Sequence, residues 1–245
     1  MHEWQLQNAR LTVFVTSDTV VASTLWRDSV GEEPENSVLQ RATSTRIETG
    51  PFADGTLTLQ IQPMRIDWGQ EPAGLGPEFG LPRVLGPFPA AAEPLLQLGR
   101  RWAASVWFPS ATRLALGFVL VSKTASRREG YQELCQFIDG VPSTPDATDF
   151  LYQVNRPRAS RAGIEDVQVN RLSKWSVGGY RCFTVAPGTP NPVPNPAPLV
   201  HHLRLELDIS TSVDFQGVIP VERVEAVIDD LLAAALEVCE HGNHL

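Results

Sequence analysis

The first candidate for chemistry in this sequence is an acid–base group, because a histidine and two carboxylates alternate in HHLRLELDI. His202, Glu206 and Asp208 lie at even spacing, and residues two apart on a strand point to the same face. A hydrolase could use His202 with Glu206 or Asp208 for general acid–base catalysis. Arg204 shares that face, so a solvated pattern of cross-strand charges is the simpler interpretation. No Gly-x-Ser-x-Gly motif is present, and the sequence argues against a catalytic site.

The second candidate is a metal site at the C-terminal end. Cys239, His241 and His244 in CEHGNH have ligand spacing, but a terminal hexapeptide without a second ligand pair is typical of a frayed end. His201 and His202 are adjacent, so on a strand they point to opposite faces and cannot chelate one ion. We therefore expect no bound metal.

A glycine-rich stretch, GLGPEFG from Gly74 to Gly80, is the only candidate for a nucleotide loop. Phosphate binding needs free backbone N–H groups at the start of a helix. Pro77 removes one such donor, no helical pattern follows directly, and there is no Walker lysine. We therefore expect a surface loop and no cofactor.

The strongest anomaly is a basic segment in an acidic chain. It contains Val-Asn-Arg twice, at Val154–Arg156 and Val169–Arg171. Between residues 154 and 181 six basic residues stand against two acidic ones, a net charge of +4, while the whole chain has −8. Arginine forks suit phosphate and carboxylate groups, and nearby aromatic rings could stack on bases.

Several uses of this segment remain open. Its arginines could face the acidic final helix of the same chain or lie solvated on both faces of a hairpin. They could also bind a protein partner or, as a weaker alternative, nucleic acid, which requires a broader basic surface. The hypothetical partner-binding residues are Arg156, Arg158, Arg161, Arg171, Lys174 and Trp175.

Hydrophobic periodicity predicts the elements that position these residues. Strands are predicted over 4–15, 38–49, 57–68, 112–122 and 202–209, and helices from residue 17 or 18 to 28, from 89 through 106, over 127–139 and from 220 onward. The strand over 112–122 is apolar on both alternating sets, which is typical of a central strand covered on two faces.

This order of elements favours an α+β fold, with a mixed or largely antiparallel sheet and helices packed on one side. Residues 1–245 are expected to form a single domain or two closely packed halves, about 1–126 and 127–245. Two long loops rich in proline and glycine interrupt the pattern, at 69–89 and 187–198.

Three blocks of the sequence occur in a familiar order: LTLQIQPMRIDW, LLQLGRRWAASVWFPSATRLALGFVLV and HLRLELDISTSVDF. Together they resemble a sporadically distributed family of uncharacterised prokaryotic proteins, often found in mobile or defence-related loci. The matched positions are Trp68, Arg113 and residues 205–209. The resemblance supplies no catalytic residues, and it implies a non-enzymatic component of a larger bacterial system.

Composition limits the class of protein to which the chain can belong. Hydrophobic residues make up 42% of the chain and charged residues 20%, which is ordinary globular usage. Its longest apolar run is too short to span a bilayer, and three widely spaced cysteines fit reduced thiols. We expect a cytoplasmic protein without membrane contact. The sequence thus favours an adaptor subunit of a bacterial, defence-related assembly, with a nucleic-acid-contacting subunit or an unrecognised hydrolase as alternatives.

Overall fold

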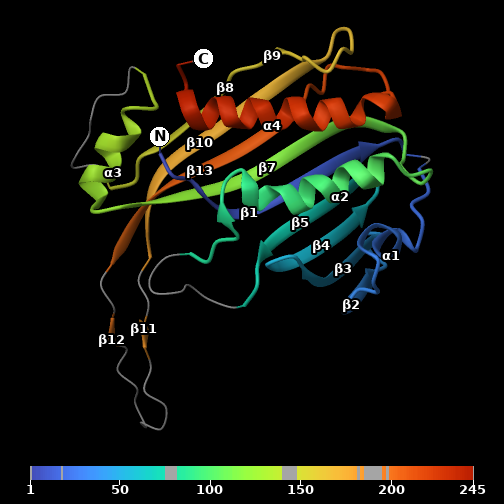
Figure 1. Cartoon of the computed structure of the whole chain (residues 1–245), viewed down its shortest axis with the longest axis horizontal. Coiled ribbons are helices and arrows are strands. Elements are labelled where there is room, and N and C mark those ends of the chain that lie inside the picture. The colour runs from blue at the N-terminus through green and yellow to red at the C-terminus, as the bar shows by residue number, and fades with distance from the viewer. Residues whose placement is uncertain are drawn as a thin grey trace.

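One large antiparallel sheet dominates the computed structural model, which describes residues 2–17, 19–74, 82–139, 148–180, 183–184, 195–196 and 199–244. Its strand order is β2-β3-β4-β5-β1-β7-β13-β10-β8 (Figure 1). These strands are β1 (Gln5–Val15), β2 (Asn36–Gln40), β3 (Thr45–Phe52), β4 (Gly55–Gln62), β5 (Arg65–Pro72), β7 (Ala111–Thr124), β8 (Leu151–Asn155), β10 (Gln168–Tyr180) and β13 (Val200–Thr211). Short strands β6 (Gly86–Pro87) and β9 (Arg158–Ala159) pair with β1 and β10, and β11 (Phe183–Thr184) pairs with β12 (Asn195–Pro196).

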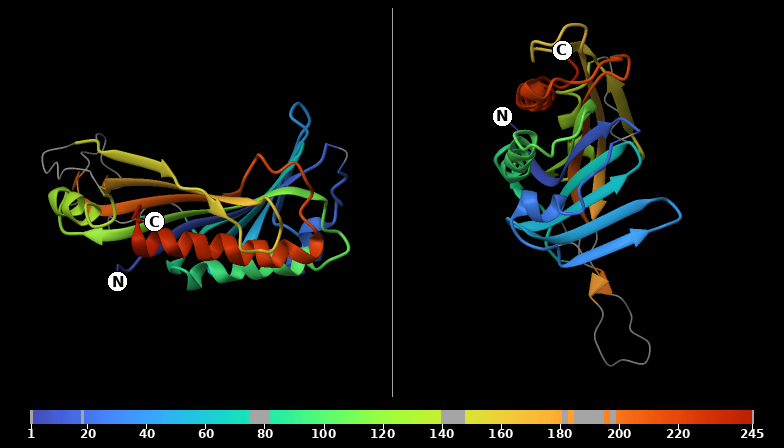
Figure 2. Two further views of the ribbon diagram at one scale, coloured as in Figure 1. Left: turned by 90° about the horizontal axis from the view of Figure 1, so that it is seen from above. Right: turned by 90° about the vertical axis from the view of Figure 1, so that its right-hand side faces the viewer.

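The helices cover one face of this sheet. They are α1 (Leu25–Val30), α2 (Glu93–Ala103), α3 (Arg127–Leu134) and α4 (Val224–His241), with 3-10 turns at Ala90–Ala92 and Val221–Arg223. The two longer helices, α2 and α4, contact each other and lie side by side on the sheet (Figure 2). Within the described part of the chain no helix lies on the opposite face, which we call the open face.

The hydrophobic core lies between the sheet and these helices. Alternate residues of the central strands, such as Leu11 and Val13 in β1 and Leu203 and Leu205 in β13, are fully buried there. Helix α4 adds an apolar stripe that includes Leu231, as expected for an amphipathic helix on a sheet. The other residue set of each strand therefore points to the open face.

The prediction of an α+β fold is wrong, because the sheet is larger and the helices are fewer than the sequence indicated. The single strand predicted over 57–68 is the hairpin β4–β5, and the strand predicted over 38–49 is the hairpin β2–β3. Met64 and Ser44 lie in these two turns with φ of 63° and 51°. Such left-handed turns without glycine leave no clear sequence signal. The helix predicted to start at residue 17 or 18 extends only from Leu25 to Val30.

In the described part of the chain, helices cover strand β7 on one face and not on the other, so the predicted coverage on two faces is also wrong. The prediction of one domain or two packed halves stays a prediction, although β7 and β13 pair directly and one core cluster includes residues of both halves. Of the two predicted loops, residues 75–81 and most of 187–198 lie outside the described residues. No described helix has the length and apolar character needed to cross a membrane.

Candidate functional site on the open face

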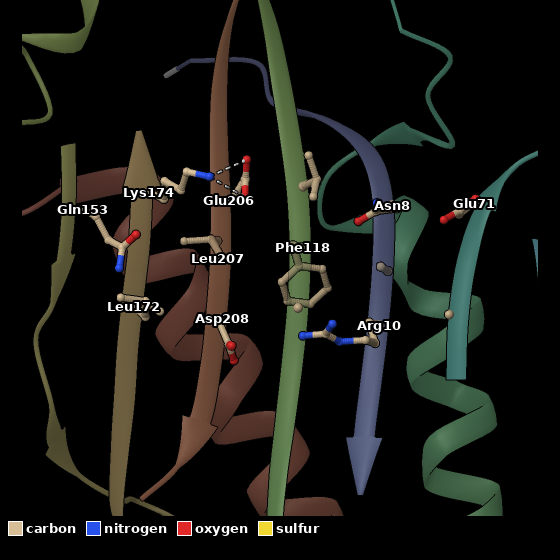
Figure 3. Close-up of a pocket in the computed structure, with 14 residues that line it drawn as sticks. Asn8, Arg10, Glu71, Phe118, Gln153, Leu172, Lys174, Glu206, Leu207 and Asp208 are labelled. Carbon is tan, nitrogen blue, oxygen red and sulfur yellow. Dashed lines mark hydrogen bonds and ion pairs between the residues drawn. The ribbon is translucent and has the colours of Figure 1, made fainter. Parts of the chain in front are cut away.

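A groove of about 470 Å³ crosses the open face, and its lining comes from β5, β1, β7, β13, β10 and β8 (Figure 3). Gly117 of β7 and Gly69 of β5 lie at its centre and have no side chains there, so side chains of neighbouring strands can reach over them. Polar and charged side chains surround this centre. They are Asn8, Arg10, Glu71, Gln153, Lys174, Glu206 and Asp208.

Strand register places an arginine and an aspartate in one cross-strand row. Arg10 pairs with Gly117, and Gly117 pairs with Asp208 on its other side. A Cβ atom at Gly117 would lie 3.4 Å from Arg10 Nη2, so the guanidinium lies over the glycine. Figure 3 shows Arg10 extending from β1 over β7 toward Asp208 on β13. The missing side chain at residue 117 therefore lets the two charges face each other.

Neither of these two charges is fully paired with the residues that the structure describes. The nearest carboxylate to Arg10 is Asp67, at 4.0 Å between Nε and Oδ1, and the Arg10 side chain is 44% exposed. Asp67 already accepts hydrogen bonds from Arg65 at 2.6 and 2.9 Å and from Thr12 at 2.5 Å. Asp208 forms no hydrogen bond or ion pair with any described residue, although its Oδ1 is shielded from solvent. The groove thus presents one available donor group and one available carboxylate.

The neighbouring row is already paired. Arg204 Nε donates to Glu206 at 2.9 Å, and Lys174 Nζ lies 3.4 Å from both oxygens of Glu206. Burial raises the pKa of Glu206, but hydrogen bonding and charge from Arg204, followed by Lys174, lower it below its ordinary value overall. Glu206 is therefore ionised at neutral pH, which suits an acceptor in recognition and not a general acid.

The structure does not bring the histidine–carboxylate group of the sequence into one pocket. His202 is 2% exposed and lies outside the groove, while Glu206 and Asp208 line it. The centroid of the His202 ring lies 5.0 Å from that of the Tyr180 ring. Burial, followed by the charges of Arg204 and His201, lowers the pKa of His202 to about 4. The three side chains therefore lie along β13 without forming one pocket, and the buried His202 is not part of a solvated row of charges.

The C-terminal candidate ligands are separated as well. Burial raises the pKa of the Cys239 thiol, while His241 is exposed beside Glu240. His244 Nδ1 forms an ion-pair contact with Asp139 at 2.7 Å. Among the residues that the structure describes, no group of three or more histidines, cysteines or carboxylates could hold a metal ion.

The basic segment contacts the acidic face of α4. Arg158 Nη2 lies 2.7 Å from Asp230, and Glu237 accepts from Arg158, Arg161 and Arg171 at 2.6–3.3 Å. The interpretation that these arginines face the final helix of their own chain is confirmed for these three. They hold the β8–β10 region against α4.

Asp230 is the most deeply buried acid of this network, at 6% exposure. It accepts hydrogen bonds from Arg158 Nη2, Ser160 Oγ and the Arg161 backbone N–H at 2.7–2.8 Å. Burial raises the pKa of Asp230, but these three hydrogen bonds lower it overall. The cluster therefore has well-defined partners within the fold, which indicates a structural role.

The other predicted partner-binding residues lie elsewhere. Lys174 points to the open face, and Trp175 is fully buried on the helix side. Arg156 is exposed and its side chain makes no ion pair in the described ranges, while Arg181 lies outside them. Partner binding by the six residues named from the sequence stays a prediction.

Sequence reasoning missed Arg10 and Gly117 as site residues. A glycine inside a strand pattern often marks a close approach by another group, so Gly117 in LALGFVLV was an available signal. Nothing local indicated that residues 10 and 208 meet across it. Comparison with protein-family models, with curated proteins and with solved structures gave no match to the chain.

Proposed function

We propose that the chain is a non-catalytic interaction subunit of a bacterial multi-protein assembly and that it binds a partner protein on its open face. The observation that supports this proposal is the groove, where Arg10 and Asp208 lie on a face that no described helix covers and have hydrogen-bonding capacity that no described residue uses. In a folded monomer such groups are usually paired, so an incoming polar surface would complete them.

The electrostatics of the groove favour recognition over reaction chemistry. Glu206 and Asp208 differ from a catalytic pair of carboxylates, because Arg204 and Lys174 keep Glu206 ionised and it cannot serve as the proton donor. A proton donor or acceptor for catalysis needs a pKa near the working pH. Fixed charges on a rigid sheet instead select a partner by complementarity and guide its approach.

A nucleic-acid role has less support. Three arginines of the basic segment are engaged with Asp230 and Glu237, and the whole chain carries −8. Phosphate binding requires an available basic surface. A protein partner is therefore the function that we propose.

The test is affinity purification of the full chain from its host, comparing the wild type with Gly117→Gln. This change places an uncharged side chain where the Arg10 guanidinium lies, and the two nearest atoms belong to that flexible side chain. Ala104→Gln, at an exposed site beyond α2, is the matched control. We expect a partner identified by mass spectrometry to be retained by the wild type and the control and lost from Gly117→Gln. A chain that purifies as a lone monomer, or equal recovery with all three forms, would contradict the proposal.

A further inference from the structure

The edge of the sheet at β2 is not covered by any described part of the chain. Strand β2 pairs with β3 on one side and stands at the end of the strand order (Figure 1). All of its residues are exposed, with Val38 at 51% and Leu39 at 63%. The backbone N–H and C=O groups on its outer side therefore point away from the fold and are available to another strand.

Strand β2 lacks the features that usually prevent pairing between edge strands. Its sequence, NSVLQ, contains no proline and no charged residue, and its register with β3 is continuous, without a bulge. The opposite edge strand, β8, is followed directly by Arg156 and Pro157, and both residue types oppose further strand pairing. Of these two edges, β2 is therefore the one suited to pairing.

Two charged residues flank β2 and determine which strand fits beside it. Glu35 precedes the strand and Arg41 follows it. Both side chains are exposed, and neither forms an ion pair or a hydrogen bond with any described residue. A second copy of β2 in antiparallel orientation, with Val38 opposite Val38, places Glu35 of each copy opposite Arg41 of the other. Opposite charges at directly opposed positions stabilise a pair of strands.

The interior of the strand fits the same register. Leu39 lies opposite Ser37, and the two amide side chains at the strand ends lie opposite each other. A slip by one residue would set side chains of opposite faces against each other. A slip by two residues would place Glu35 opposite Leu39 or, in the other direction, opposite Thr43. The pairing of Glu35 with Arg41 is lost in both cases, so the register centred on Val38 is favoured.

We propose that two copies of this chain form a dimer through antiparallel pairing of β2 with β2, with two-fold symmetry about Val38. This inference goes beyond the proposed function and does not depend on it. The two-fold axis is perpendicular to the sheet, so both copies keep their open faces on the same side. Two grooves on one side of a continuous sheet would increase the affinity for a partner that has two binding segments.

The test is sedimentation equilibrium of the purified full chain over a range of concentrations, which measures the dissociation constant of the dimer. We expect a reversible monomer–dimer equilibrium for the wild type. Glu35→Arg and Arg41→Glu each create two contacts between like charges and should weaken the dimer about tenfold.

The double variant Glu35→Arg/Arg41→Glu restores both pairs of opposite charges at the net charge of the wild type. Its dissociation constant should return to the wild-type value. A wild type that stays monomeric at every concentration, or a double variant as weak as the single variants, would overturn the proposal.

Two matched variants locate the interface. Val38→Lys places like charges at the two-fold axis, and Leu151→Lys makes the same change at a residue of the other edge strand, β8, that is 56% exposed. We expect Val38→Lys to abolish the dimer and Leu151→Lys to leave it unchanged. The reverse result, or an equal loss in both variants, would overturn the assignment to β2. Gly117→Gln, in the groove and away from β2, should dimerise as the wild type does, so loss of the partner and loss of the dimer are separate results.

Discussion

At the scale of single residues, two aspartates of this chain show how surroundings decide a role. Asp230 is buried and accepts three hydrogen bonds from Arg158, Ser160 and the Arg161 backbone. Asp208 is half-buried and has no partner among the described residues. A buried charge with complete partners stabilises one packing arrangement, whereas a charge without partners is available to a ligand.

Replacing Asp230 with Asn tests the structural role of the first aspartate. Arg158 would lose its ionised partner in a buried site, and the pKa shift of Asp230 shows that the fold favours the charged form. We expect the free energy of unfolding to fall by about 3 kcal/mol. Asp229→Asn removes an adjacent but largely exposed carboxylate paired with Arg100 and should cost less than about 1 kcal/mol. Denaturant unfolding of both variants measures the contrast, and equal losses would contradict it.

His202 predicts a dependence of stability on pH. Its pKa falls from 6.5 to about 4 on folding, mainly through burial. The unfolded chain therefore binds a proton below pH 6.5, while the folded chain takes it up only near pH 4. Stability from this residue is present above pH 6.5 and is lost as the pH falls toward 4, by up to about 3 kcal/mol.

The measurement compares unfolding of the wild type and His202→Phe between pH 7 and pH 4. Phenylalanine keeps a ring beside Tyr180 and removes the ring nitrogens, of which the buried Nδ1 has no hydrogen-bond partner in the described part of the chain. Carboxylates such as Glu206 contribute equally to both proteins, so the difference isolates His202. If the free energy of unfolding changed with pH in the same way for both proteins, His202 would not be the cause of the loss of stability between pH 6.5 and pH 4.

At the scale of elements, the closest approach of a helix to the sheet depends on one glycine. Gly99 of α2 lies against β1, and a Cβ there would be 2.5 Å from Leu11 Cδ2 and 3.6 Å from Ile228 Cδ1 of α4. Glycine is unfavourable inside a helix, so its presence indicates that packing outweighs helix propensity. Helix α2 can therefore contact β1 and α4 at the same time.

Gly99→Ala should destabilise the protein by about 1–3 kcal/mol, because the added methyl group pushes α2 away from Leu11. Helix propensity alone would give the opposite sign, a gain of up to about 1 kcal/mol. Thermal unfolding followed by circular dichroism decides between the two. Arg101→Ala, at an exposed position of the same helix, is the control and should stay close to the wild type. A rise in melting temperature for Gly99→Ala would refute the packing argument.

At the scale of the whole molecule, the sheet joins both halves of the chain. Strands β1 and β7 come from the first half, and β13, which pairs with β7, comes from the second. One core cluster includes residues such as Leu11, Trp68 and Leu231. Because both halves of the chain contribute to this one core, neither half buries its apolar residues without the other.

We therefore expect residues 1–245 to unfold in one cooperative transition. Tryptophan fluorescence and far-ultraviolet circular dichroism should give superimposable denaturation curves. A fragment of residues 1–126 should show no cooperative unfolding, because the edge of β7 that pairs with β13 would be exposed. Two separated transitions in the full chain would instead support two independently stable halves.

Elements with strong local periodicity could be predicted from the sequence. It predicted β1, β13 and α4 closely, since alternating or helical patterns in these segments are continuous. The contrast between a basic segment and an acidic last helix likewise offered contact with α4 as one of several open uses of this segment, and the structure shows that contact for Arg158, Arg161 and Arg171. These features depend on residue type and short-range spacing, which are visible in one dimension.

The fold class and the groove depend on how the strands assemble in three dimensions. The turns at Ser44 and Met64 have positive φ angles, and the sequence there contains no glycine or Asn-Gly pair that would indicate such a turn. The groove depends on the strand order, which places Gly117 between Arg10 and Asp208, residues far apart in sequence. Strand pairing over such distances is selected by burial of the whole core rather than by local preference. That is why the arrangement of Arg10 and Asp208 on either side of Gly117 was not predictable before the strands were assembled.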